Sequence, residues 1–144
     1  MGKYTKSIEI EASPEEVFNF VNDTEKMNKA HEGLTKVEYT STGPVGVGTI
    51  GHFVSKAGEF DAEITEFVKN KKVTYHTIEA SKFKLTGSFI LEPTTKGTKL
   101  TNSFDYELPY SILGKLIGKF KVSKELDKET TLWLGNAKKA LEAK

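Results

Sequence analysis

The chain has 144 residues, of which 21 are Lys or Arg, 20 are Asp or Glu and none is cysteine. This length predicts one domain, residues 1–144, and the lack of cysteine excludes disulfides, thiolate metal sites and cysteine nucleophiles. The balanced charge does not favour a nucleic-acid partner, and no segment has the pattern of a signal peptide or a membrane span, so we expect a cytoplasmic protein without integral membrane contact.

One strand and two short helices are predicted at the start of the chain. Residues 3–11 alternate between apolar and polar side chains, as in a strand with one buried face. Ser13 has the properties of a helix N-cap, Pro14 suits the first helical position and Glu16 completes a capping box. A second short helix is predicted over residues 23–30, so two helices would separate the first strand from the next.

About six further strands are predicted between residues 37 and 108, where apolar and polar side chains alternate between short turns. Strict alternation with short turns is typical of an antiparallel sheet that has one wet face and one buried face. The alternation breaks at Glu66, which indicates a bulge. The Glu66 carboxylate then either points inward or, as we favour, lies at a solvated strand end.

After Pro109 the period becomes helical, and an apolar stripe runs from Leu113 to Leu141 with most lysines outside it. A helix of about 30 residues would be about 45 Å long. Only a strongly curved sheet can cover so long a stripe, and one helix rarely fills the space against such a sheet. We therefore predict an α+β fold in which a curved antiparallel sheet of about seven strands wraps around a long C-terminal helix and leaves an apolar pocket.

Short motifs occur in a fixed order along the chain. They are Ser13-Pro14-Glu15-Glu16-Val17-Phe18, Val47-Gly48-Thr49, Ile64-Thr65-Glu66-Phe67, Phe89-Ile90-Leu91-Glu92-Pro93 and Gly97-Thr98. With the helical tail, this order resembles the START-like or SRPBCC superfamily, which has the helix-grip fold. Within that superfamily the sequence is most similar to the polyketide cyclase/dehydrase and lipid-transport branch.

The resemblance implies a cavity for hydrophobic small molecules between the sheet and the long helix. It does not imply one activity, because family members include cyclases, hydrolases, carriers and co-chaperones. The sequence departs from the common pattern at Ala30 and Gly51, where bulkier residues are usual. Either change would enlarge or open the pocket, or leave it poorly defined.

The pocket walls are predicted from the inward-facing aromatic residues and one amide. The residues are Tyr39, Phe53, Tyr75, Phe89, Asn102, Phe104, Phe120 and Trp133. Asn102 interrupts an apolar face, so it either bonds a backbone group or a buried water, or orients a polar group of the ligand. The tyrosines either pack in the core with their hydroxyls at the rim, as we favour, or grip a carbonyl or phenol of the ligand.

No metal site and no cofactor are expected, because the three histidines do not share a metal-binding spacing. His52 and His76 are predicted on the outer face of the sheet. His31 is predicted in a loop at the rim of the pocket and is the histidine to test as a general acid or base. The catalytic residues, if there are any, are not indicated by the sequence.

Three functions remain open at this point. The leading hypothesis is a binding protein for a small hydrophobic or aromatic molecule, such as a lipid or a polyketide-like compound, acting as a monomer or weak dimer. The second is a cyclase, dehydratase or hydrolase in which Asn102, a tyrosine or His31 is the acid or base. The third is an interaction module of the co-chaperone type, which predicts a filled core and an exposed apolar patch.

Overall fold

The structure, a computed structural model, describes residues 2–33, 35–55, 58–78, 84–107 and 117–143; for residues 58 and 117–123 only the backbone is described. In chain order the elements are β1 (Gly2–Ile10), α1 (Pro14–Val21), α2 (Thr24–Ala30), β2 (Thr35–Tyr39), β3 (Ile50–Ser55), β4 (Gly58–Val68), β5 (Lys72–Thr77), β6 (Lys84–Pro93), β7 (Thr98–Glu107) and α4 (Ile117–Glu142). The strands form one antiparallel sheet in the order β1-β7-β6-β5-β4-β3-β2. The α+β prediction is confirmed.

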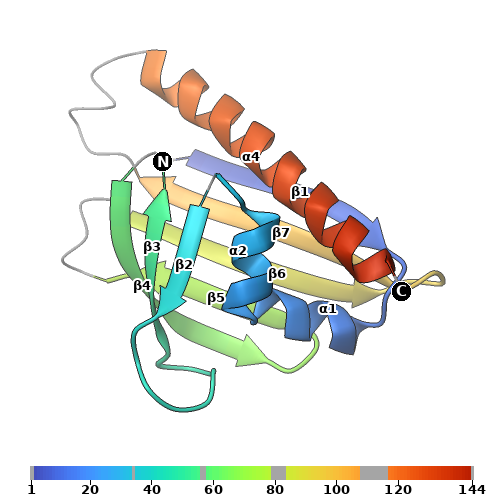
Figure 1. Cartoon of the computed structure of the whole chain (residues 1–144). Helices are drawn as coiled ribbons and strands as arrows, with labels where there is room; N and C mark the ends of the chain where they lie inside the picture. Colours follow the sequence, from blue (N-terminus) through green and yellow to red (C-terminus); the bar gives the residue numbers. More distant parts are fainter. Residues whose placement is uncertain (1, 34, 56–57, 79–83, 108–116, 144) are drawn as a thin grey trace.

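The sheet is curved, and α4 runs diagonally over its concave side next to β1 (Figure 1). The helix contacts β1, α2 and α1. Near its N-terminal half, the Tyr4 hydroxyl of β1 donates a hydrogen bond of 2.7 Å to Asp127, and the Lys6 ammonium lies 3.5 Å from the same carboxylate. The helix predicted after Pro109 is present from Ile117 onward; residues 108–116 lie outside the described residues.

The two short helices begin where the sequence predicts them. The Ser13 hydroxyl accepts from the Glu16 N–H at 3.2 Å, and the Asp23 carboxylate accepts from the Lys26 N–H at 3.2 Å, so each cap satisfies a backbone donor that the helix leaves unpaired. The apolar face of α1 consists of Val17, Phe18, Phe20 and Val21, all of which are buried. This face joins Ile10, Leu100 and Leu134 in the core.

The bulge expected at Glu66 is present, because the register between β4 and β5 shifts between Ile64 and Glu66. The Glu66 carboxylate is exposed and lies 3.0 Å from the Lys72 ammonium. The carboxylate therefore lies on the solvated side, as the favoured interpretation has it.

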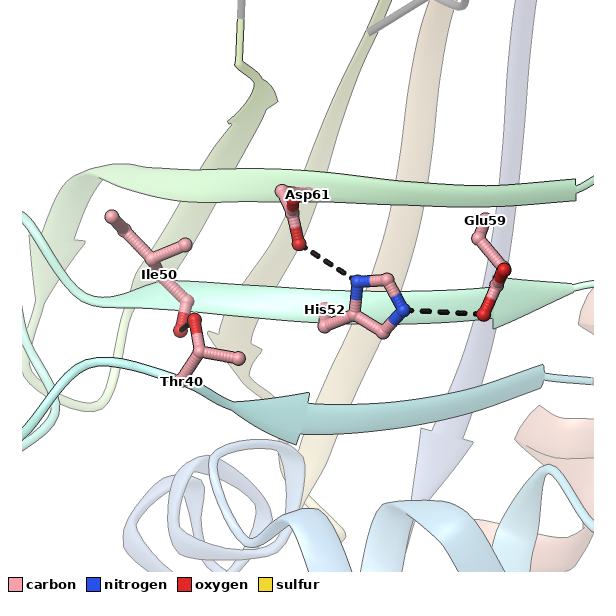
Figure 2. Close-up of polar contacts among 5 residues, drawn as sticks. All are labelled: Thr40, Ile50, His52, Glu59 and Asp61. Carbon is pink, nitrogen blue, oxygen red and sulfur yellow. Dashed lines mark hydrogen bonds and ion pairs between the residues drawn. The ribbon is translucent and has the colours of Figure 1, made fainter.

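The outer face of the sheet carries His52, as predicted. Figure 2 shows its ring on β3 between two carboxylates of β4: Nδ1 lies 2.8 Å from Asp61 and Nε2 lies 3.3 Å from Glu59. Asp61 is the cross-strand partner of His52, so the antiparallel register creates this contact. His76 is also exposed, and its Nδ1 lies 2.6 Å from the Thr86 hydroxyl.

Among the described helices, none combines the length and the apolar character that crossing a membrane requires.

Candidate ligand cavity

A cavity of about 710 Å³ lies between the sheet and α4, and residues from α1, α2, α4 and six of the seven strands line it. This volume lies in the range typical of small-molecule sites, about 300–1,000 Å³. Part of the space arises because small residues occupy neighbouring inner positions, where Gly51 on β3 pairs with Ala62 on β4. Gly51, where the resemblance leads one to expect a bulky residue, therefore contributes to the volume.

Six rings form a continuous series along the cavity wall, and we call this series the aromatic arc. In spatial order it runs Phe60, Phe53, Tyr75, Phe89, Trp133 and His31, with centroid separations of 5.0, 5.5, 5.8, 5.7 and 4.8 Å. All six residues line the cavity. The arc connects the β3–β4 side of the sheet to α4 and α2, so it presents one extended aromatic surface to any molecule in the cavity.

Asn102 on β7 lines the cavity and is 1% exposed. Its Nδ2 donates to the Ser88 carbonyl oxygen at 3.1 Å, and its Oδ1 accepts from the Trp133 indole N–H at 3.2 Å. The expectation that Asn102 bonds a backbone group is confirmed, and the amide also holds the indole of the arc. Its role toward a ligand stays a prediction.

Tyr75 owes its position to a glycine on the neighbouring strand. Tyr75 on β5 pairs with Gly87 on β6, and a Cβ at Gly87 would lie 2.5 Å from the Tyr75 Cζ atom and 2.6 Å from its hydroxyl oxygen. The ring therefore lies directly over the Gly87 backbone, a position that only glycine leaves open. Burial raises the pKa of Tyr75, and a hydrogen bond with Asn102 acts in the opposite direction.

Tyr39 also lines the cavity, but its hydroxyl already has an acceptor. It donates to the Asn22 carbonyl oxygen at 3.1 Å. Burial, and to a lesser extent the Asp23 carboxylate, raise the pKa of Tyr39 to about 12. Both tyrosines line the cavity, but their hydroxyls have different partners: the Asn22 carbonyl oxygen for Tyr39 and the Asn102 amide for Tyr75.

His31 lies in the turn after α2 and lines the cavity, as predicted, but it is more deeply buried than a residue at the rim. It is the C-cap residue of α2, its ring stacks on Trp133 and its side chain lines the cavity. Burial lowers the pKa of His31 to about 4, so the imidazole is neutral at pH 7. Its Nδ1 is buried and has no hydrogen-bond partner among the described residues. The burial of the ring was not predicted, because it depends on the contact of the turn with Trp133.

The predicted pocket residues are brought together with one exception. Tyr39, Phe53, Tyr75, Phe89, Asn102, Phe104 and Trp133 all line the cavity. Phe120 belongs to α4, but its side chain lies outside the described residues.

The pattern-based list omits Phe60, Met27 and Leu126, which also line the cavity. Phe60 alternates inward on its strand and Leu126 falls on the helical stripe, so sequence signals for both exist. Met27 lies on a helix of seven residues, which is too short for a clear period.

Charged residues line one end of the cavity, where Lys84 begins β6 and Glu107 ends β7 as cross-strand partners. Glu125 and Glu129 of α4 also line the cavity. Within the ranges that the structure describes, no group of three or more histidines and carboxylates is arranged to hold a metal ion.

Comparison with known proteins places the fold in context. The sequence profile of the family described as polyketide cyclase/dehydrase and lipid transport matches residues 1–142. No curated protein matches the sequence.

Solved structures with this fold come from several sources. The protein TTHA0849 from Thermus thermophilus has a TM-score of 0.81 and 20% identity, over 99% of this chain and 98% of that chain. The Aha1 dimer from Colwellia psychrerythraea has a TM-score of 0.69 and 19% identity, over 99% and 97%.

The di-domain ARO/CYC protein BexL from the BE-7585A biosynthetic pathway has a TM-score of 0.77 and 18% identity, and the match covers 99% of this chain and 50% of BexL. At these identities the structures share the fold, whereas the profile match extends over nearly all of the sequence. The chain belongs to the START-like family of polyketide cyclase/dehydrase and lipid-transport proteins.

Proposed function

We propose that the protein binds a small hydrophobic or aromatic molecule, such as a lipid or a polyketide-like compound, in the cavity between the sheet and α4. The observation that carries the proposal is a cavity of about 710 Å³ with the aromatic arc along its wall. The family description, which joins cyclases and lipid transport, supports the same class of ligand. The predicted pocket residues would provide the contacts, including Phe120 if its side chain faces the cavity.

Burial of apolar surface would supply most of the affinity. At about 25 cal/mol per Å², covering about 300 Å² of ligand surface contributes on the order of 7 kcal/mol before the entropic cost of association. Stacking against the arc adds a preference for flat, aromatic molecules. Polar groups such as Asn102 would then set the orientation of the ligand.

Native mass spectrometry tests the proposal. The purified protein is exposed to a lipid and metabolite extract of its own cells, and a retained adduct of defined mass is expected. The matched control is Ala62→Phe, which adds a ring at an inner position that now lines the cavity. This variant should keep the fold and retain less adduct. An adduct-free spectrum from folded wild-type protein, together with no uptake of a neutral fluorescent probe, would contradict the proposal.

Catalysis in the same cavity is the second candidate. Two features favour it: the family description includes cyclases and dehydrases, and the neutral His31 imidazole lies inside the cavity. A dehydratase would convert the adduct over time into one that is lighter by one water. That conversion should stop in His31→Gln if His31 is the base, whereas a binding protein would keep the adduct unchanged.

The proposal describes one ligand-binding domain that works in the cytoplasm, as a monomer or weak dimer and without nucleic acid. A co-chaperone role has less support, because it predicts a filled core and an exposed apolar patch. Among the described residues the exposed large hydrophobics are Val47, Val54, Val68 and Leu132, which lie in a loop and on three different elements. Light scattering of the folded protein tests the oligomeric state.

A further inference from the structure

The orientation of the Asn102 amide is fixed by two partners that cannot exchange roles. The Ser88 carbonyl oxygen only accepts hydrogen bonds, so the atom facing it is Nδ2. The Trp133 indole nitrogen only donates, so the atom facing it is Oδ1. The NH₂ group has two hydrogens, and Ser88 takes one of them. Asn102 therefore has one further N–H to offer inside the cavity wall.

The Tyr75 hydroxyl lies next to this amide and interacts with it. Asn102 forms a hydrogen bond with Tyr75 that acts to lower the tyrosine pKa, against the larger upward effect of burial. A phenol oxygen accepts hydrogen bonds independently of the hydrogen that it donates. Contact with the remaining Asn102 N–H therefore leaves the Tyr75 O–H hydrogen available.

The surroundings of the Tyr75 hydroxyl favour the cavity as the direction for that hydrogen. On the sheet side, the ring and hydroxyl lie against the Gly87 backbone, at a spacing that has no room for a Cβ. Apart from the Asn102 amide, no hydrogen-bond partner of the Tyr75 hydroxyl is found among the described residues, whereas the hydroxyl of Tyr39 donates to the Asn22 carbonyl oxygen. Tyr75 also lines the cavity, between Phe53 and Phe89 of the arc.

From this geometry we infer that Tyr75 is a specificity residue whose hydroxyl donates into the cavity and selects ligands that carry a carbonyl oxygen beside an aromatic ring. The inference rests on the proposed function and narrows it. A ketone oxygen has two lone pairs and no hydrogen, so it matches a lone donor. A pure hydrocarbon of the same shape leaves the donor without a partner, which lowers its affinity.

Two probes of nearly equal shape test the inference: 2-acetylnaphthalene, which has the carbonyl, and 2-ethylnaphthalene, which lacks it. Each is titrated against the protein loaded with the neutral fluorophore N-phenyl-1-naphthylamine, and displacement gives the affinity. The wild-type protein should prefer the ketone by about 3- to 10-fold, as one net hydrogen bond provides.

Tyr75→Phe keeps the stacking ring and removes the donor, so the preference should fall to about one while the affinity for 2-ethylnaphthalene is retained. Tyr39→Phe is the matched control, because it removes a hydroxyl that is already bound to Asn22. If Tyr39→Phe changes the affinity, it should change it by the same factor for both probes. Gly87→Ala should also lose the preference by displacing the Tyr75 ring; if it does not fold, Tyr75→Phe decides alone.

Infrared spectroscopy distinguishes a hydrogen bond from Tyr75 from a role of Tyr75 in packing alone. The stretch of a ¹³C-labelled carbonyl in bound 2-acetylnaphthalene should lie at lower frequency in the wild type and in Tyr39→Phe than in Tyr75→Phe. Equal affinities of both probes for the wild type, or an unchanged preference in Tyr75→Phe, would overturn the inference and leave the proposed function in place. Failure of the fluorophore and both probes to bind folded protein would overturn both.

Discussion

The pKa of histidine shifts in opposite directions on the inner and outer sides of the sheet. On the outer face, His52 lies between Asp61 and Glu59, and these hydrogen bonds raise its pKa (Figure 2). On the inner side, His31 lies against Trp133 with no charged partner, and burial lowers its pKa to about 4. The comparison shows that the cavity disfavours charge around Trp133, away from the end that Lys84 and Glu107 line, whereas the outer face accommodates it. Neighbouring residues of one strand, such as His52 and Phe53, can therefore meet opposite environments.

The largest expected effect comes from removing the indole at the middle of the inner side. Trp133 is 1% exposed, and Trp133→Ala should lower the free energy of unfolding by about 3–5 kcal/mol. The substitution also removes the donor that Asn102 uses. Urea denaturation measures the loss. The control is Leu132→Ala on the exposed side of α4, for which a change of less than about 1 kcal/mol is expected.

The next effect concerns His31 and acid. Its pKa in the folded protein, about 4, lies below the ordinary value of 6.5, so the unfolded chain binds the proton more readily. Stability from this group is complete above pH 6.5 and falls as the pH decreases toward 4. At pH 5 the loss should be about 2 kcal/mol. Unfolding free energies at pH 7 and pH 5 measure it, and His31→Gln should be less sensitive to acid. An equal loss in both proteins would show that His31 does not cause it.

A polar residue on each face of β7 gives a third comparison. Asn102→Leu leaves the Trp133 N–H and the Ser88 carbonyl without their partner, so a loss of about 1–3 kcal/mol is expected. Thr101→Val removes a hydroxyl that bonds Ser7 on the outer face, where water replaces it, and about 0.5 kcal/mol or less is expected. Thermal or urea unfolding of both variants measures the difference. Equal losses of unfolding free energy in the two variants would mean that the hydrogen bonds of Asn102 stabilise the fold no more than the exposed hydroxyl of Thr101 does.

The smallest effect is predicted for His52. Its pKa is raised in the folded state by Asp61 and Glu59, so its stabilising contribution is present below its ordinary pKa of 6.5 and disappears as the pH rises through the folded value. His52→Gln should therefore lower the Tm slightly at pH 5.5 and not at pH 9, with the difference weakened by salt. His76→Gln is the control, since its partner is the uncharged Thr86 hydroxyl. If His52→Gln lowered the Tm at pH 9 but not at pH 5.5, the predicted direction of the pH dependence would be wrong.

Local patterns were sufficient for the fold and for several aromatic residues of the cavity wall. Alternation of period two placed Phe53, Tyr75 and Phe89 on the inner face, and the capping pattern at Ser13 located α1. These signals are local, because each depends on a few neighbouring residues.

The features that patterns missed depend on distant partners. The Asn102–Trp133 hydrogen bond joins residues 31 positions apart, and the need for glycine at position 87 is visible only once its register with Tyr75 is known. The depth of His31 was missed because the orientation of a helix of seven residues, and of the turn after it, depends on what the helix packs against. The polar arrangement of the cavity is therefore a tertiary property.

The contact of α4 with β1 has a consequence for synthesis on the ribosome. Tyr4 and Asp127 are separated by 123 positions, so the helix that covers the cavity leaves the exit tunnel long after the strands that form its floor. Until then the nascent chain would expose the sheet residues of the aromatic arc to water and to other chains. Binding can begin only after translation has delivered the last helix, and chaperones that shield aromatic surfaces would act on this protein during that interval.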